Sequence, residues 1–461
     1  MPLSASSAMA WIRPVVRMVI GLYYSKVEVS NRERIPSRGP ILLVANHANS
    51  LIDPVLIGIA TARPVGFFAK APLFEVPVFG QALRALGMLP AHRGMDDPSQ
   101  VKRNVATLAS GARLLVRGAA VGIFPEGKSH DSLKLALIRS GPARIAMQAV
   151  RDGARELKVI PIGINYERKE RFRSAVWVRV GTPIEAASFL AQYGSEERQA
   201  LRALTTEIER RIKDVAIHLT EENWEPFLGF LEIVFPPPAA GNSDPIASLR
   251  HRKAVADAIN HFLARDKPRA ETVAADLRQH FAGLAEFGLD MHAPVIRLRG
   301  TMLFASLVGK VILLALGFIP ALLATLHHLA PFLVVRGIGR RVQMPGRTTI
   351  SQVRLGLGLP IYAAWYGVVA WWMGRQISPW LATIWVLVMP WAGVFSLNYW
   401  RLARDTSRAW RQEIRMLFRE GELEKLRRTQ IELGERLQSM AEEYQSTERG
   451  KTANVVKTLS G

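Results

Sequence analysis

The feature that most constrains the fold of this chain is a series of apolar runs that end in polar residues and alternate with helical patterns. The runs with their polar ends are residues 41–47, 87–93, 121–130 and 159–166, and the helical patterns between them are 54–62, 104–117 and 143–151. This alternation predicts an α/β domain with a mostly parallel sheet and flanking helices. In such sheets, ligands bind beyond the carboxyl ends of the strands, so the polar residues are expected to meet along one edge.

A histidine and an aspartate follow the first of these runs. The run ends at His47, and Asp53 lies at the start of the next helical pattern, where an acidic residue is stable. The carboxylate can hold one tautomer of the imidazole and raise its basicity, so that the ring can take a proton from an alcohol. A loop histidine beside a helix-capping aspartate is the alternative interpretation. The chain has no cysteine, which excludes a thiol nucleophile.

The charge balance limits the classes of partner. The chain has 60 Lys and Arg against 39 Asp and Glu, which gives a formal net charge of +21. A basic protein favours polyanions, either nucleic acids or an anionic membrane surface. The sequence contains no zinc-ligand spacing, RNA-binding motif or isolated basic arm, and its last third is strongly apolar. We therefore expect a phospholipid membrane as partner and no nucleic acid.

Composition divides the chain into five regions. They are an N-terminal membrane-associated helix (1–27), the α/β domain (28–190), a helical extension (191–300), a membrane region (301–400) and a basic amphipathic tail expected in the cytoplasm (401–461). The first region predicts an interfacial helix whose arginines reach lipid headgroups, or an amphipathic helix that covers the sheet. The tail predicts a solvated helix on the membrane surface, with a short self-associating coiled coil as the alternative.

The membrane region contains two spans of bilayer length, 355–373 and 379–400, with flanking tryptophans. Basic residues before the first span and after the second predict that both flanks are cytoplasmic and that the turn 374–378 lies outside. If the α/β domain is also cytoplasmic, residues 301–335 must leave and return on one side, yet they are too few for two crossings of about 20 residues each. We expect a re-entrant or interfacial hairpin there, bent near Pro320 and His327-His328.

Residues 28–190 resemble the glycerol-phosphate and lysophosphatidate acyltransferase superfamily of integral-membrane enzymes. The four sequence blocks of that family occur in order, as Asn46-His47 with Asp53, Gly87 to Arg93, Phe124-Pro125-Glu126-Gly127 and Val159-Ile160-Pro161. The family usually has four residues between His and Asp where this chain has five, and Thr-Arg-Ser after Glu-Gly where this chain has Lys128-Ser129-His130. Both departures resemble the branch of glycerol-3-phosphate and dihydroxyacetone-phosphate acyltransferases, which has a helical extension and C-terminal membrane spans.

The resemblance implies acyl transfer from a thioester, acyl-CoA or acyl-carrier protein, to a hydroxyl of a glycerol-phosphate acceptor in phospholipid biosynthesis. His47 would be the general base and Asp53 would orient it. The residues implied around the acceptor phosphate are Arg93, Glu126, Gly127, Lys128 and Ser129. Among them Glu126 is expected to hold the loop or Arg93, because a carboxylate repels phosphate. Direct attack on the thioester requires no acyl-enzyme, metal or cofactor.

Two alternatives remain open at this level. The acceptor could be a lysophospholipid, which would make the protein a remodelling acyltransferase, since acceptor size cannot be read from the sequence. A catalytically silent membrane lipid-binding protein is the other alternative, and the intact His47, Asp53, Arg93 and Glu126 argue against it. The expected location is the bacterial inner membrane or the endoplasmic reticulum, with the catalytic domain in the cytoplasm.

Overall fold

The chain forms two compact units. The computed structural model describes residues 5–77, 79–91, 101–194, 196–235, 244–286, 300–342, 347–417 and 420–459. The first unit contains residues 1–223, 237–257 and 344–352, and the second contains 224–236, 258–343 and 353–461.

The first unit is built on one sheet. The eight described strands are β1 (Lys26–Ser30), β2 (Ile41–Ala45), β3 (Val65–Lys70), β4 (Leu89–Ala91), β5 (Ala120–Ile123), β6 (Lys158–Tyr166), β7 (Ala175–Val180) and β8 (Ile184–Glu185). Their order is β1-β7-β6-β2-β5-β3-β4, and β8 pairs with β6. All pairs are parallel except those that β6 makes with β7 and β8. The predicted α/β fold with a mostly parallel sheet is confirmed.

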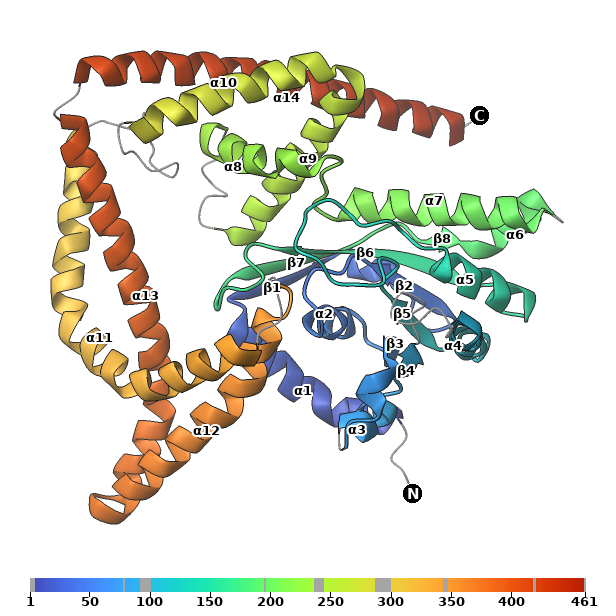
Figure 1. The fold of residues 1–461 in the computed structure, drawn as a ribbon, viewed down its shortest axis with the longest axis horizontal. Helices are drawn as coiled ribbons and strands as arrows, with labels where there is room; N and C mark the ends of the chain where they lie inside the picture. Colours follow the sequence, from blue (N-terminus) through green and yellow to red (C-terminus); the bar gives the residue numbers. More distant parts are fainter. Residues whose placement is uncertain are drawn as a thin grey trace. The chain divides into compact units, whose positions relative to one another are not determined.

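Helices cover both faces of this sheet, which explains why the central strands are apolar throughout. The helices are α1 (Ala5–Tyr23), α2 (Ile52–Ala60), α3 (Phe79–Ala85), α4 (Val101–Val116), α5 (Gly141–Arg151), α6 (Ala186–Tyr193) and α7 (Glu197–Val215). Figure 1 shows α6 and α7 on one side of the sheet and α1 and α2 on the other. Every residue of β2 is buried, so its carboxyl end is rigidly placed for the loop that follows.

The N-terminal helix α1 is tied to α2. The guanidinium of Arg13 donates hydrogen bonds to the carbonyl oxygens of Gly58 (2.9 Å), Thr61 (2.5 Å) and Ala62 (2.7 Å), around the end of α2. Carbonyl groups at a helix end have no partner within the helix, so the arginine satisfies them. Arg13 therefore binds the end of α2, as a helix covering the sheet requires, and the membrane association of α1 stays a prediction.

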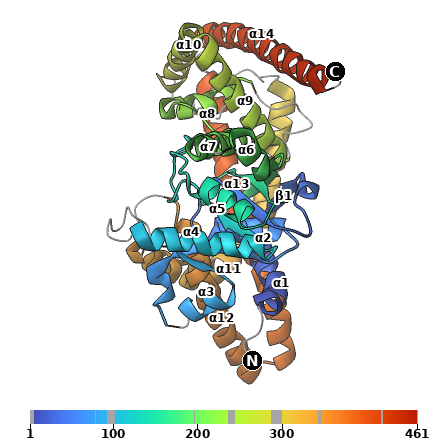
Figure 2. The same ribbon diagram turned by 90° about the vertical axis from the view of Figure 1, so that its right-hand side faces the viewer.

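The second unit is helical. Its helices are α8 (Glu225–Val234), the later part of α9 (Pro245–Arg265), α10 (Lys267–Glu286), α11 (Gly300–Val342), α12 (Ile350–Gln376) from residue 353, α13 (Pro379–Leu417) and α14 (Glu420–Leu459). Figures 1 and 2 show α10 and α14 side by side. The ion pairs Arg436–Asp276 (2.6 Å) and Arg269–Glu443 (2.7 Å) join these two helices.

The packing of α14 differs from the predicted solvated helix. Leu433, Leu437 and Met440, which belong to the apolar seam of the tail, are buried. The predicted solvated helix on the membrane surface did not include this packing, because the helix α10, to which α14 is joined, lies some 160 residues earlier in the chain. The seam instead serves packing within the chain.

Three described helices are long and apolar enough to cross a membrane: Val308–Arg341, Ile350–Gln376 and Pro379–Gln412. The first belongs to α11, which is one continuous helix and does not reverse as the predicted hairpin requires. The histidines expected at the bend have partners in the bundle, since His328 Nε2 lies 2.8 Å from Tyr366 Oη and His327 Nε2 accepts from Trp365 Nε1 (3.2 Å). The described helix has no hairpin turn, and how residues 301–335 meet the membrane stays a prediction.

Candidate active site

His47 and Asp53 are in hydrogen-bond contact. His47 follows β2 and Asp53 lies in the first turn of α2, and their Nδ1 and Oδ2 atoms are 2.9 Å apart. Five residues separate His47 from Asp53. One of them, Ser50, has a φ of 32°, in the left-handed region, and this conformation lets the longer loop bring the two side chains together. The backbone N–H of Ile52 then donates to Asn49 O (2.9 Å) and starts the helix.

Asp53 is fully buried and its two oxygen atoms are held from three sides. Besides His47, the backbone N–H of Asn49 donates to Oδ2 (2.7 Å) and Tyr166 Oη donates to Oδ1 (2.5 Å). Burial and the adjacent Asp53 carboxylate raise the pKa of Tyr166 well above its usual value, so its hydroxyl remains a donor. Because the carboxylate cannot turn, it fixes the imidazole with Nδ1 as the protonated nitrogen.

The imidazole of His47 stacks on a phenyl ring and stays accessible. Its ring lies 4.1 Å from that of Phe124 at 15°, and Phe124 in turn stacks on Phe67. The side chain of His47 is 13% exposed. Within the part of the chain that the structure describes, no hydrogen bond engages Nε2, which leaves this nitrogen available to a substrate hydroxyl.

The loop after β5 is held to the His47 loop by Glu126. Its Oε1 accepts the backbone N–H of His47 (2.7 Å), and its Oε2 accepts that of Ala136 (2.9 Å) and is paired with His130. The residue is 3% exposed, so its carboxylate meets protein donors and not solvent. Glu126 thus has the loop-holding position that charge repulsion from a phosphate favours.

The other residues of this loop differ in what they contact. Gly127 has a φ of +75°, which glycine adopts without strain, and a Cβ there would meet the side chain of Arg139 at 3.4 Å. Ser129 Oγ lies 3.1 Å from Ser50 Oγ, beside the His47 loop. Lys128 is exposed. Arg93 lies outside the described residues, so its predicted place at the phosphate remains a prediction.

The buried side chain of Lys169 contacts both the loop that carries His47 and the loop after β5. Lys169, 8% exposed, follows β6 and donates from Nζ to Ala48 O (2.9 Å) and to His130 O (3.1 Å). Its charge is balanced by Asp131, at 2.6 Å. Burial opposes the charged form of Asp131, but hydrogen bonds from the Arg347 backbone and from Lys169 lower its pKa below the usual value. The ion pair therefore fixes the distance between the two loops.

Comparison with known proteins identifies the domain. Residues 26–165 match the family model described as Acyltransferase. The first unit contains an acyltransferase domain of the glycerolipid acyltransferase superfamily. This confirms the resemblance in the four sequence blocks, of which the first and the third contribute residues to the two loops described above.

Relatives of the acyltransferase domain include named enzymes. It is 34% identical over 107 residues to glycerol-3-phosphate O-acyltransferase 1 of Saccharomyces cerevisiae, which is 22% of this chain and 14% of the relative. It is 30% identical over 129 residues to the chloroplastic 1-acyl-sn-glycerol-3-phosphate acyltransferase LPAT1 of Arabidopsis thaliana, which is 28% of this chain and 34% of the relative. The matches span less than half of these relatives.

A solved structure is also similar. The crystal structure of the 1-acyl-sn-glycerophosphate acyltransferase PlsC from Thermotoga maritima matches with a TM-score of 0.33 and 22% identity, over 44% of this chain and 78% of that one.

Three residues around His47 and Asp53 were not predicted from the sequence. Tyr166 and Lys169 emerge from the end of β6, at the edge where parallel strands place their ligands. That rule would have found Tyr166, which ends the fourth apolar run. Asn49 could not be predicted from its residue type, because it bonds Asp53 through its backbone N–H and not through its side chain.

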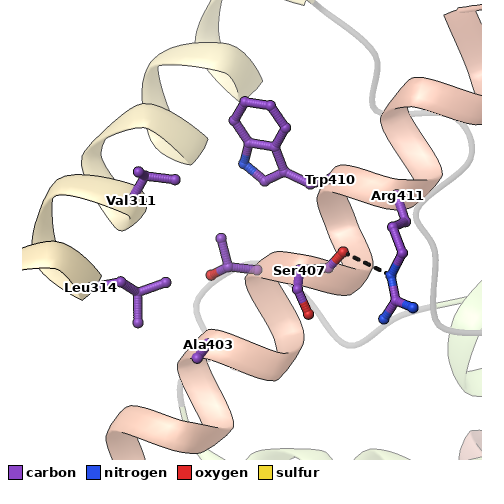
Figure 3. A pocket seen from close by; sticks show the side chains of 7 residues that line it. Val311, Leu314, Ala403, Ser407, Trp410 and Arg411 are labelled. Atoms are coloured by element: carbon purple, nitrogen blue, oxygen red, sulfur yellow. Dashed lines mark hydrogen bonds between the residues drawn. The ribbon is translucent and has the colours of Figure 1, made fainter. Parts of the chain in front are cut away.

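Two further observations concern other kinds of site in the described parts of the chain. No group of three or more His, Cys, Asp and Glu side chains able to hold a metal occurs among the residues that the structure describes. A pocket of about 470 Å³ lies between α11 and α13 of the second unit (Figure 3). Its apolar lining includes Val311, Leu314 and Trp410, with Arg411 at its rim, and it carries no acid–base pair.

Proposed function

We propose that the protein is a membrane-bound O-acyltransferase that acylates a hydroxyl of a glycerol-phosphate acceptor, with His47 as general base. The observation that carries this proposal is the contact between His47 Nδ1 and a buried, fully bonded Asp53, which leaves Nε2 accessible. A neutral imidazole oriented in this way is suited to take a proton from an alcohol.

The chemistry follows from this orientation. The acceptor hydroxyl attacks the carbonyl carbon of a thioester, and its proton moves to His47 Nε2. The imidazolium that forms is stabilised by the Asp53 carboxylate. The tetrahedral intermediate then collapses, the carbon–sulfur bond breaks, and the thiolate takes the proton from Nε2 to leave as a thiol. No covalent intermediate on the enzyme and no metal enter these steps.

The acceptor phosphate is assigned to the loop after β5. Gly127 lets a ligand approach the backbone closely, while the exposed Lys128 supplies charge and Ser129 supplies a hydroxyl. Arg93 would add a bidentate contact. Glu126 supports this loop from behind, through the backbone of His47.

The substrates and surroundings are part of the same proposal. The donor would be acyl-CoA or acyl-carrier protein, the acceptor a glycerol phosphate in phospholipid biosynthesis, and the catalytic domain would face the cytoplasm. A lysophospholipid acceptor is the second candidate, favoured by the similarity of the domain to an enzyme named for 1-acyl-sn-glycerol-3-phosphate. A catalytically silent lipid-binding protein would not need the buried Asp53 with three donors.

A membrane assay tests the proposal directly. Membranes that contain the protein are given labelled acyl-CoA or acyl-carrier protein with glycerol-3-phosphate, dihydroxyacetone phosphate or lysophospholipids, and the acylated product is measured. We expect product with a phosphorylated glycerol acceptor and a fall of about a hundred- to ten-thousand-fold in His47→Ala. Wild-type turnover in folded, membrane-bound His47→Ala would refute the role of His47, and no product with any pair would refute the function.

A further inference from the structure

A short segment far along the chain belongs to the acyltransferase unit. Residues 347–352, here called the strap, follow α11 and include the first turn of α12, yet they form part of the first unit. Three of its residues, Thr348, Thr349 and Ser351, are buried, and Ser351 has no exposed surface. The strap begins one of the helices that are apolar enough to cross a membrane.

One end of the strap contacts the loop that carries His47. Ser351 Oγ donates to the carbonyl oxygen of Lys169 and lies 3.4 Å from Asn49 Nδ2, from which it can accept. Gln352 Oε1 accepts the backbone N–H of Leu51 at 3.2 Å. The strap thus binds the loop at the two positions that flank Ser50, where the backbone is in the left-handed region.

Asn49 connects this contact to the catalytic pair. Its side chain is fully buried, and its Nδ2 also donates to Tyr24 Oη (3.0 Å). Its backbone N–H donates to Asp53 Oδ2 (2.7 Å), the same oxygen that holds His47 Nδ1. A shift of Asn49 would therefore move or weaken a bond to the carboxylate that orients the base.

The other end of the strap contacts the second loop. The backbone N–H of Arg347 donates to Asp131 Oδ2 (2.7 Å), and Asp131 pairs with Lys169 (2.6 Å). Lys169 in turn binds the carbonyl oxygens of Ala48 and His130, one on each loop. Both ends of the strap therefore converge on Lys169, one through its carbonyl and the other through its ion pair.

We propose that the strap is a positioning element for the His47–Asp53 pair and that Ser351 is its central positioning residue. This inference rests on the proposed function, because it concerns the geometry of the same base. Its physical reason is that the Ser351 hydroxyl both donates and accepts, so it satisfies two buried groups at once. Removing it leaves a buried amide and a buried carbonyl each without that partner, and the loop relaxes away from the carboxylate.

The chain offers a matched control in the same segment. Thr349 is buried like Ser351, but its Oγ has no hydrogen-bond partner among the described residues. Thr349→Val keeps the shape of the side chain and removes a hydroxyl that holds nothing. Ser351→Thr keeps the hydroxyl that the proposal requires.

The test compares these variants with Ser351→Ala in membranes or in detergent. We expect Ser351→Ala to lower kcat about tenfold and to change both KM values less than twofold, since no substrate contact is lost. Ser351→Thr should recover most of the turnover, and Thr349→Val should match wild type. Gln352→Ala, a partly exposed position that should fold normally, is expected to lower kcat a few-fold.

Hydrogen–deuterium exchange of peptides that cover residues 46–53 gives a readout that does not depend on activity. Faster exchange in Ser351→Ala, with unchanged exchange in Thr349→Val, is expected whether or not the acceptor has been identified. A kcat in Ser351→Ala within twofold of wild type overturns the proposal, even if exchange rises. An inactive wild type with the expected exchange pattern refutes the proposed function and the catalytic role of the strap while retaining its contact with the loop.

Discussion

Glu126 Oε1 accepts the backbone N–H of His47 at 2.7 Å, so a carboxylate of the third sequence block holds the backbone of the histidine in the first. The backbone N–H of His130 also donates to His47 O, at 3.2 Å. Both backbone groups of His47 are therefore bonded to the loop after β5. The base and the predicted phosphate loop behave as one structural element.

Replacing Glu126 should damage the His47 loop as well as its own. Glu126→Ala leaves the part-buried N–H groups of His47 and Ala136 without their acceptor, and a buried group left unpaired costs at most about 1–3 kcal/mol. We expect a lower melting temperature together with at least a tenfold loss of kcat. Glu126→Gln, which keeps one acceptor oxygen, should lie between Ala and wild type in both measurements. Equal melting temperatures for all three proteins would contradict the role given to this carboxylate.

Asp53→Asn removes the negative charge beside His47 while keeping the hydrogen bonds of the side chain. The asparagine oxygen can still accept from Asn49 and His47 while its NH₂ group faces Tyr166 Oη, which can accept. The tautomer is then retained, and only the charge that stabilises the imidazolium is lost. We expect kcat to fall about ten- to a hundredfold, less than in His47→Ala, with little change in KM. A loss as large as that of His47→Ala would mean that the tautomer has changed.

Lys128 should affect the acceptor more than the donor. Removing a contact between a cation and a phosphate costs roughly 1.5–3 kcal/mol, so Lys128→Ala should raise the acceptor KM about ten- to a hundredfold. Arg93→Ala should act in the same direction. Lys158→Ala is a suitable control, because Lys158 begins β6 at the opposite edge of the sheet. If the acceptor KM is unchanged in both Lys128→Ala and Arg93→Ala, the phosphate does not bind at these loops.

His218 should make the stability of the protein depend on acid pH. Burial, together with the nearby charge of Lys213, lowers its pKa from 6.5 to about 4. A histidine that is neutral when folded is protonated first in the unfolded state. The contribution of neutral His218 to the free energy of unfolding is therefore complete above pH 6.5. It is lost as the pH falls toward 4, at about 1.4 kcal/mol per pH unit.

Thermal unfolding from pH 7.5 to 4 measures this contribution. His218→Gln should flatten the loss of melting temperature between pH 6.5 and 4, whereas His251→Gln, a partly exposed histidine of the same unit, should retain the wild-type slope. If the slope is the same in all three proteins, His218 is not the group that titrates.

Membrane topology can be tested by thiol labelling, because the chain lacks cysteine. The basic flanks predict that residue 376, at the end of α12, is accessible from outside sealed cells to an impermeant reagent, and that residue 128 is not. A cysteine at 346 reports on α11. This cysteine should stay unlabelled like residue 128, because the adjacent Arg347 is bonded to Asp131 of the same unit. Labelling at 346 without labelling at 128 would support one complete crossing by α11 and would contradict the contact of the strap with the His47 loop.

The fold was predictable where the sequence signal is local. The apolar run of β2 and the alternation with helices follow from burial on both faces of a parallel sheet. The antiparallel return of β7 beside β6 was not predicted, because pairing direction depends on the connection and not on strand composition. The continuity of α11 was not predicted for a related reason, since the expected hairpin was inferred from the side on which charges lie and not from any turn in the sequence.

The site was predictable to the same extent. His47 and Asp53 stand close in sequence and follow a strand, so their contact could be expected. Ser351 contacts Asn49, which lies 302 positions earlier in the chain, and no local sequence pattern indicates such a contact. Lys169 was missed because a lysine after a strand is ordinarily a solvated residue, and only the fold buries it between two loops.

The direction of β1 has a practical consequence. Because β1 pairs in parallel with β7, and β7 runs opposite to β6, β1 begins at the edge of the sheet where the catalytic loops emerge. Tyr24, just before β1, therefore sits beside Asn49, with 3.0 Å between its Oη and Nδ2. A truncation from the amino terminus that removes Tyr24 would therefore remove a hydrogen-bond partner of Asn49, whose backbone holds Asp53. Affinity tags and fusions are better attached at the other terminus.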